Sequence, residues 1–235
     1  MLIDIAGVRK HYGALRPLRV NALQVAPGQR LTVRGLDAQA AEMLSLLITG
    51  AALPDEGVVT IAGRDTRDID TDTDWLVSLD VFGLVTARAV LLETLTLEAN
   101  LALPFTLSID PVPEEIRRTV ADLADEVGLG RERLSASVHS LSVADRVRVH
   151  LARALAASPQ VLLLEHISAP LTPSDATALG HSLAAIADER RLAWIAITED
   201  PTFIAALGSP VWKLEAASGE VAPVPGGTAG GITTW

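Results

Sequence analysis

The sequence predicts an α/β fold built around a parallel sheet. Residues 161–164 and 192–198 are almost continuously apolar, which is typical of strands buried on both faces of such a sheet. Stretches with helical periodicity separate these runs from each other and from earlier strands, and this alternation favours parallel pairing. The third observation is a short apolar strand at residues 30–35, which leads through a loop into a helix-like run.

The first 84 residues predict several strands and one helix. Alternating or apolar runs bounded by Gly and Pro predict the strands, and a run of helical periodicity that stops before Pro54 predicts the helix. The expected strands are residues 2–8, 18–25, 30–35, 58–62 and 75–84, and the expected helix is residues 40–53.

Helices dominate the predicted structure of the later residues. Glu114 and Glu115 place negative charge in the first turn of a helix, where the helix dipole favours it, and Ser142 suits the N-cap of the next helix. The expected helices are residues 113–127, 143–157 and 174–189. Residues 219–235 are rich in Gly, Pro, Thr and Ala, so we expect a flexible tail there.

Composition and charge exclude several classes of protein. The chain has 235 residues, a net charge of −10 and no cysteine. The negative charge argues against general nucleic-acid binding, which needs clustered Lys and Arg. The lack of cysteine excludes a disulfide framework and a thiolate metal site. No run reaches the roughly 18 apolar residues of a membrane span, and no signal-peptide pattern is present. We therefore expect a cytoplasmic protein that reaches a membrane only through a partner.

One acidic stretch could be mistaken for a calcium site. Residues 65–74 contain five Asp, but they lack the glycine and the terminal bidentate Glu of an EF-hand loop. We expect a solvated loop there.

Residues 35–42 occupy the place of a phosphate-binding loop without its key side chains. Gly35 fits the first glycine of the pattern Gly-x-x-x-x-Gly-Lys-Ser/Thr. Ala40 stands at the second glycine, Ala41 at the lysine and Glu42 at the hydroxyl that would hold magnesium, with Met43 following. Charge-assisted hydrogen bonds are worth about 1.5–3 kcal/mol each, so these losses cost roughly 4 kcal/mol, or about a thousandfold in affinity. Nucleotide binding is therefore expected to be weak.

In order and spacing, residues 1–218 resemble the nucleotide-binding domain of ABC transporters. Residues 141–164 carry the resemblance most strongly, and residues 95–104 make it most similar to the class that serves lipoprotein, lipid and macrolide export. In the signature loop Ser142 is kept, whereas Val143 and Ala144 replace two glycines. The resemblance implies a P-loop NTPase-like (RecA-like) core, an antiparallel β subdomain and an inserted helical subdomain at about residues 88–157. It also implies ATP and Mg²⁺ as ligands.

The resemblance assigns further roles that the residues present no longer suit. Tyr12 stands where the family stacks an aromatic ring on adenine, and Ala87 replaces the Q-loop glutamine. Glu165 replaces the magnesium-binding Asp, His166 the catalytic Glu and Glu199 the switch histidine. A histidine can act as a general base, but the missing lysine and glutamine argue against that role.

The substituted positions also suggest a different hypothesis. Glu42, Glu165, His166 and Glu199 are expected to converge near the former phosphate site, where three carboxylates and an imidazole could bind a divalent cation. The alternative is that polar residues fill an exposed cleft after selection for catalysis is lost.

The sequence is interpreted as an ABC-type subunit that is degenerate for ATP hydrolysis. Such a subunit would pair with an intact ATPase subunit, as a hetero- or homodimer, and would seat a membrane permease on its helical subdomain. Two alternatives stay open, namely an ATP-hydrolysing subunit with unusual motifs and a scaffold or regulatory protein without a transporter.

Overall fold

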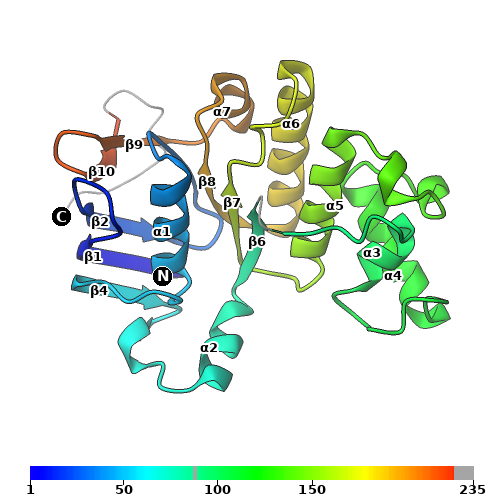
Figure 1. The fold of residues 1–235 in the computed structure, drawn as a ribbon, viewed down its shortest axis with the longest axis horizontal. Helices are drawn as coiled ribbons and strands as arrows, with labels where there is room; N and C mark the ends of the chain where they lie inside the picture. Colours follow the sequence, from blue (N-terminus) through cyan, green and yellow to red (C-terminus); the bar gives the residue numbers. More distant parts are fainter. Residues whose placement is uncertain (87–88, 225–235) are drawn as a thin grey trace.

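The computed structural model describes residues 1–86 and 89–224, whose strands form one mixed sheet (Figure 1). In spatial order the strands are β5 (Arg64–Asp65), β4 (Glu56–Ile61), β1 (Ile3–Lys10), β2 (Leu18–Val25), β10 (Glu220–Pro223), β9 (Val211–Glu215), β3 (Arg30–Arg34), β8 (Ala193–Ile197), β7 (Val161–Glu165) and β6 (Phe82–Thr86).

The sheet changes from antiparallel to parallel across its width. β1 pairs antiparallel with β2 and β4, whereas β3, β8, β7 and β6 are parallel neighbours. β9 and β10 join the two parts, because β9 is parallel to β3 and β10 is antiparallel to β9. The predicted parallel α/β core is thus confirmed, with an antiparallel layer at its edge.

The parallel strands are buried on both faces, as their continuous apolar character predicts. Leu162 and Leu164 of β7 belong to one hydrophobic core, while Val161 and Leu163 belong to the other. This alternation follows from the period of two along a strand. α1 (Ala38–Ile48) contributes to the second core, and α5 (Val143–Leu155), α6 (Pro173–Arg190) and α7 (Pro201–Leu207) contribute to the first.

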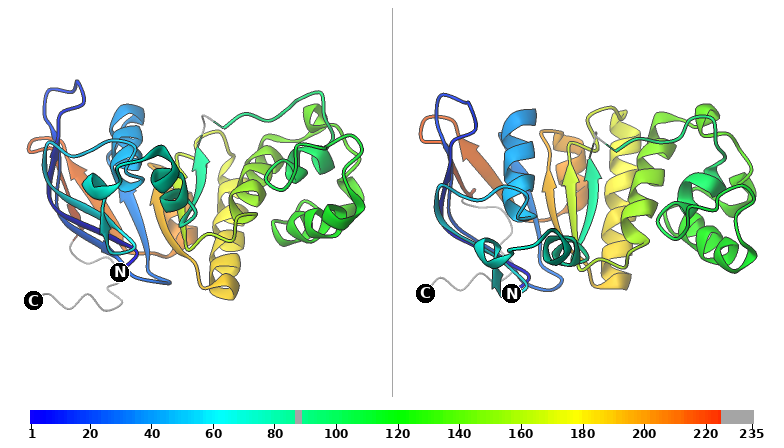
Figure 2. Two further views of the ribbon diagram at one scale, coloured as in Figure 1. Left: turned by 90° about the horizontal axis from the view of Figure 1, so that it is seen from below. Right: turned by 60° about the horizontal axis from the view of Figure 1, so that its bottom comes forward.

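The helices of the middle of the chain gather at one end of the molecule. α3 (Leu97–Ala102), α4 (Glu114–Glu126) and α5 lie together, away from the antiparallel strands (Figure 2). Three short 3₁₀ turns, η1 (Thr66–Asp68), η2 (Arg131–Arg133) and η3 (Val138–Ser140), complete the helical elements. Across the described ranges, no helix has both the length and the apolar character needed to cross a membrane.

The strand expected at residues 75–84 is wrong in its first half. Residues Asp72–Leu79 form the helix α2, and only Phe82–Thr86 form a strand. Thr71 caps α2 by accepting a hydrogen bond of 3.1 Å from the amide of Asp74, and the acidic first turn suits the helix dipole. The N-cap therefore favours a helix at residues 72–79, where the apolar side chains alone suggested a strand.

Two segments expected to lack regular structure are partly ordered. Residues 65–74 contain η1 and the start of α2, with the side chain of Asp65 capping η1. The expected flexible tail begins with β10, which extends the sheet beside β9. Residues 225–235 of that expected tail lie outside the described residues.

Candidate functional site

The loop after β3 is closed by a side chain of its own. Gly35 adopts a φ of +85°, and a Cβ built there would lie 3.0 Å from the carbonyl oxygen of Leu214 on β9. Asp37 caps α1, because its Oδ1 accepts a hydrogen bond of 2.8 Å from the amide of Ala40. Free amides at a helix N-terminus attract anions, and here an internal carboxylate takes one of them.

Glu199 supplies a second internal carboxylate to the same loop. It follows β8, the parallel neighbour of β3, and its Oε1 accepts a hydrogen bond from the amide of Gly35. The preceding Thr198 is buried, and its hydroxyl lies 3.0 Å from Ser168 Oγ and accepts a hydrogen bond of 3.1 Å from the amide of Asp200. The segment that carries Glu199 is therefore held in place from several sides.

The residues at the phosphate-loop positions do not fit a nucleotide triphosphate with magnesium. Ala40 and Ala41 are 1% and 0% exposed and belong to the core beneath the loop, and Met43 packs beside that core. Asp37 and Glu199 place negative charge where a phosphate would have to lie, and like charges repel strongly at short range. No lysine at this loop offsets them.

A buried hydrogen bond joins α1 to the end of β7. Ser45 Oγ donates to Glu165 Oε2 at 3.0 Å, and the two residues are 5% and 6% exposed. Glu165 was expected at this site from the sequence, but Ser45 was not. Ser45 could have been found as a lone hydroxyl within the apolar run of α1, because it lies three residues after Glu42 and therefore on the same helical face.

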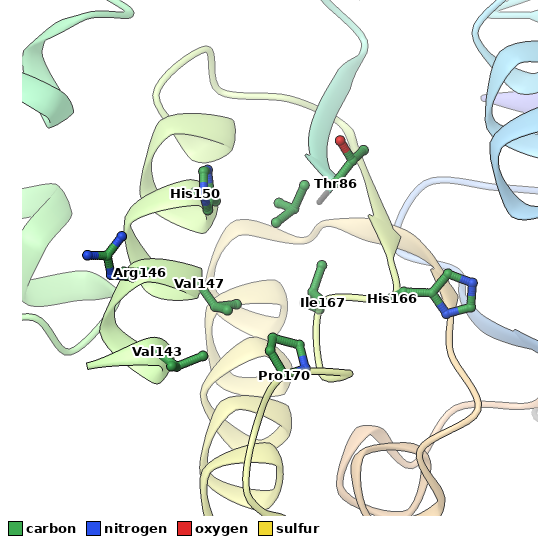
Figure 3. A pocket seen from close by; sticks show the side chains of 9 residues that line it. Thr86, Val143, Arg146, Val147, His150, His166, Ile167 and Pro170 are labelled. Atoms are coloured by element: carbon green, nitrogen blue, oxygen red, sulfur yellow. The ribbon is translucent and has the colours of Figure 1, made fainter. Parts of the chain in front are cut away.

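His166 is held in an unusual backbone conformation. Its φ is +51°, a left-handed value that costs a non-glycine residue about 1–2 kcal/mol. Its amide donates to the carbonyl oxygen of Ile197 at 2.8 Å, and its buried Nε2 has no hydrogen-bond partner among the described residues. His166 is among the residues that line a cavity of about 190 Å³, and Figure 3 shows its imidazole ring pointing away from Val143 and Val147 on the far wall. Within residues 1–86 and 89–224, no acidic side chain forms a hydrogen bond that would orient the ring as a general base.

The predicted metal-binding group is not assembled. Within residues 1–86 and 89–224, no three His, Asp or Glu side chains are grouped so as to hold a metal ion. Glu199 is engaged with Gly35 and Glu165 with Ser45, so these two carboxylates serve the protein's own donors. Ala87, the Q-loop position, lies outside the described residues.

A cavity of about 540 Å³ opens beside the loop, with Tyr12 in its wall. Gly35, Asp37 and Ala40 also line it, so the structure brings Tyr12 and the loop positions together. Gln39 Nε2 donates to the carbonyl oxygen of Tyr12 at 2.7 Å. Partial burial raises the pKa of the Tyr12 hydroxyl, and the charge of Asp37 raises it further. An aromatic side chain thus lies in the same cavity as the negatively charged Asp37.

The signature positions form the start of α5. Ser142 is the N-cap, and its Oγ accepts a hydrogen bond of 3.1 Å from the amide of Asp145. Val143 is 51% exposed, and Ala144 is half-buried. Glycines are expected at these two positions from the family resemblance, and the side chains present here stand between the backbone and anything that approaches it. An apolar cavity of about 190 Å³ lies behind Val143, lined also by Val147, Ile167 and Pro170 (Figure 3).

A groove of about 320 Å³ is lined by residues of β6, of α5 and of the segment after α3. We call it the β6–α5 groove; Phe82, Gly83, Leu84, Leu103, Pro104, His150 and Arg153 line it. Gly83 permits the close approach of β6 and α5, because a Cβ there would lie 2.8 Å from the carbonyl oxygen of Ala154. Exposed apolar side chains adjoin the groove in the sequence, with Phe105 37% and Leu107 90% exposed.

His150 connects this groove with the apolar cavity, because it lines both. Burial lowers the pKa of its imidazole, and the positive charges of Arg153 and Arg146 lower it further. Arg146 forms an ion pair with Glu93, with Nη2 2.9 Å from Oε2. The Arg146 hydrogen bond lowers the pKa of the Glu93 carboxyl.

The fold and the position of this loop define an ATP-binding-cassette architecture of the P-loop NTPase type, and the comparison with known proteins agrees. The chain belongs to the ABC transporter family, whose model matches residues 19–167. It is 32% identical over 228 residues to the methionine import ATP-binding protein MetN of Brucella abortus, covering 91% of this chain and 61% of that protein. It is 28% identical over 178 residues to the lipoprotein-releasing system ATP-binding protein LolD of Pseudomonas syringae pv. tomato, covering 76% and 78%. The chain thus spans about three fifths of the length of the MetN relatives.

Solved structures support the same fold. A nucleotide-free ATP-binding cassette from an ABC transporter superimposes with a TM-score of 0.76 at 15% identity, covering 94% of this chain and 89% of that one. The ATP-binding cassette MJ0796, in a dimeric post-hydrolysis state with ADP and Pi, gives a TM-score of 0.73 at 22% identity, covering 93% and 96%. The predicted family and fold class are therefore confirmed.

Proposed function

We propose that this chain is an ABC-type subunit of a membrane transport or extraction complex that does not hydrolyse ATP itself. It acts by pairing with an intact ATPase subunit and by seating a membrane permease, and it lies on the cytoplasmic face of the membrane through that permease. Family membership supports the transport setting, since the relatives are named as ATP-binding proteins of import and release systems.

The observation that carries the proposal is the occupation of the loop donors. The amides of Gly35 and Ala40 already bond to the carboxylates of Glu199 and Asp37. A phosphate would have to displace two anions that belong to the chain, without a lysine to compensate. A phosphate would form hydrogen bonds of the same kind with these amides, about 1.5–3 kcal/mol each, so the exchange gains nothing from them. Repulsion between the phosphate and the displaced carboxylates makes the exchange unfavourable.

The β6–α5 groove is the surface that we assign to the permease. The apolar residues of its lining and the exposed Phe105 and Leu107 offer contact area to a partner without relying on catalytic groups. Contiguous apolar surface marks partner sites, and these side chains adjoin one another in the sequence next to the groove. The fold is retained, under this proposal, because docking needs the shape of the domain and not its chemistry.

The pairing surface includes the start of α5. Ser142 is engaged in capping its own helix, and Val143 projects into solvent. We therefore assign to this signature loop a packing role against the partner subunit and not a contact with γ-phosphate. The metal-site hypothesis has no place in this function, because its four residues form no cation-binding group among the described side chains.

The test combines turnover with complex formation. Phosphate release from ATP by the purified full chain is expected to stay at background. Co-expression of the chain with its neighbouring genes is expected to yield a co-purifying complex that contains a permease and an ATPase. Turnover that His166→Ala abolishes would instead establish the alternative of an ATP-hydrolysing subunit. If neither a permease nor an ATPase co-purifies, the scaffold alternative is favoured.

A second candidate, nucleotide binding without hydrolysis, is favoured by one observation. The cavity beside Tyr12 has a volume of about 540 Å³, which is enough for a ring system. Equilibrium dialysis with ATP and with adenosine separates this candidate from the first, because binding of either ligand supports it even when turnover is absent.

A further inference from the structure

A second groove lies at the C-terminal end of α1, whereas the phosphate loop precedes the N-terminus of this helix. We call it the Trp75 groove; it has a volume of about 330 Å³, and its lining includes Leu53, Thr66, Ile69, Asp70, Asp72 and Trp75. It shares no lining residue with the β6–α5 groove. Figure 1 shows α2, one of its walls, standing apart from the sheet.

Trp75 contributes an aromatic ring, held in place by a hydrogen bond, to the lining of the Trp75 groove. Trp75 is half-buried, and its Nε1 donates to the carbonyl oxygen of Thr49 at 3.0 Å, which fixes the indole against the end of α1. Asp72, Trp75 and Leu76 stand at i, i+3 and i+4 of α2 and therefore share one face of the helix. Leu76 is 58% exposed and Leu53 is 47% exposed.

Two carboxylates at the rim of this groove lack a compensating cation. Asp70 and Asp72 are exposed, and neither forms an ion pair with any described residue. The one arginine in the lining, Arg67, is engaged by Asp65, with Nη2 2.8 Å from Oδ2. The positive charge nearest to the groove is thus already neutralised within the chain.

The lining of the Trp75 groove also contains a buried polar group without a hydrogen-bond partner among the described residues. Thr66 is 3% exposed, and its Oγ1 has no hydrogen-bond partner among the described residues. Buried polar groups are normally paired, so an orphaned hydroxyl in the lining of a groove indicates a missing partner.

We propose that the Trp75 groove binds a basic amphipathic segment of a partner protein, and that this docking is independent of nucleotide and of the β6–α5 groove. A Lys or Arg of the segment lies over the Trp75 ring between Asp70 and Asp72, where the ring face and both carboxylates attract a cation. Apolar side chains of the same segment cover Leu53 and Leu76. Charge complementarity selects the partner, because the groove combines exposed apolar surface with unpaired negative charge.

The probe is a helical peptide of Leu and Lys about 14 residues long, with the apolar residues on one face. Binding to the full chain is followed by titration calorimetry, with a Leu/Glu peptide and a Ser/Lys peptide of the same spacing as comparisons. The Leu/Lys peptide is expected to bind saturably, one per chain, while the other two bind at least tenfold more weakly.

Variants locate the site on the protein. Asp70→Asn with Asp72→Asn is expected to weaken binding about fivefold, as expected for two solvent-exposed ion pairs. The matched control, Glu115→Gln with Glu189→Gln, removes two exposed charges from α4 and α6 and is expected to change binding less than twofold. Trp75→Ala is expected to weaken binding by a similar factor, and Trp75→Phe keeps a ring if the alanine variant does not fold.

Three results would overturn the proposal. If both double variants weakened peptide binding equally, the peptide would be attracted by the overall negative charge of the chain and not by this groove. If the Ser/Lys peptide bound as tightly as the Leu/Lys peptide, apolar contacts with the groove would play no part in binding. Absence of binding by the Leu/Lys peptide to a folded wild-type chain would reject it outright.

Discussion

Glu199 accepts a hydrogen bond from the backbone amide of Gly35, so a side chain from the end of β8 closes the loop at the end of β3. The contact depends on the parallel pairing of these two strands, which brings their carboxyl ends together. Asp37 completes the closure from within the loop by capping α1. The loop is therefore held by two internal carboxylates that accept hydrogen bonds from its backbone amides.

Removing the two internal charges is expected to improve binding of anionic nucleotides. In Glu199→Gln with Asp37→Asn, each amide side chain can still accept the loop hydrogen bond, but the repulsion is lost. Affinity for ATP or ADP should rise about tenfold or more, equivalent to about 1.4 kcal/mol. Equilibrium dialysis measures it. The control Asp4→Asn with Glu189→Gln changes the net charge by the same amount but at positions far from the loop. An equal gain in nucleotide affinity in this control would refute the explanation.

Gly35→Ala is expected to destabilise the fold by about 2–3 kcal/mol. The left-handed φ costs about 1–2 kcal/mol for any Cβ, and contact with the Leu214 backbone adds to it. Gly63 is the matched control, since its φ is +86° and a Cβ there meets nothing within 4 Å. Urea denaturation gives the free energy of unfolding of both alanine variants. The difference between their losses measures the contact of the new Cβ with the Leu214 backbone. Equal losses would mean that Leu214 contributes nothing.

Ser45→Ala is expected to lower the free energy of unfolding by roughly 1–3 kcal/mol. The substitution removes a buried hydroxyl donor from the Glu165 carboxylate, and such a loss is costly where water cannot replace it. A double-mutant cycle with Glu165→Gln measures the coupling. An additive cycle would show that the two side chains do not interact in solution.

The free energy of unfolding is expected to decrease as the pH is lowered, and His150 is expected to cause part of this decrease. Its folded-state pKa is depressed, so below the unfolded pKa of about 6.5 the unfolded chain binds a proton that the folded chain resists. The contribution is therefore complete above pH of about 6.5 and is lost as pH falls through the folded pKa. His150→Gln should flatten the melting temperature between pH of about 7.5 and 5. His181→Gln, on the exposed side of α6, should not, and an identical effect of both would exclude His150 as the cause.

Much of the fold was predictable because its signals are local. The apolar run at residues 161–164 predicts a strand buried on both faces, and Ser142 predicts the start of α5. The same reasoning failed at α2, where Trp75, Leu76 and Val77 resemble a strand. There the Thr71 cap decides the conformation, and its energy outweighs weak β propensity.

The sequence by itself determined which chemical groups are present, including the alanines and the glutamate in place of the phosphate-loop side chains. Only the tertiary structure decided what the replacements do, because Glu199 and Gly35 are 164 residues apart and meet through strand pairing. The same holds for Ser45 with Glu165 and for the metal hypothesis, which required four side chains to converge. Which side chains meet is set by packing and register over the whole sheet, and no local pattern in the chain records it.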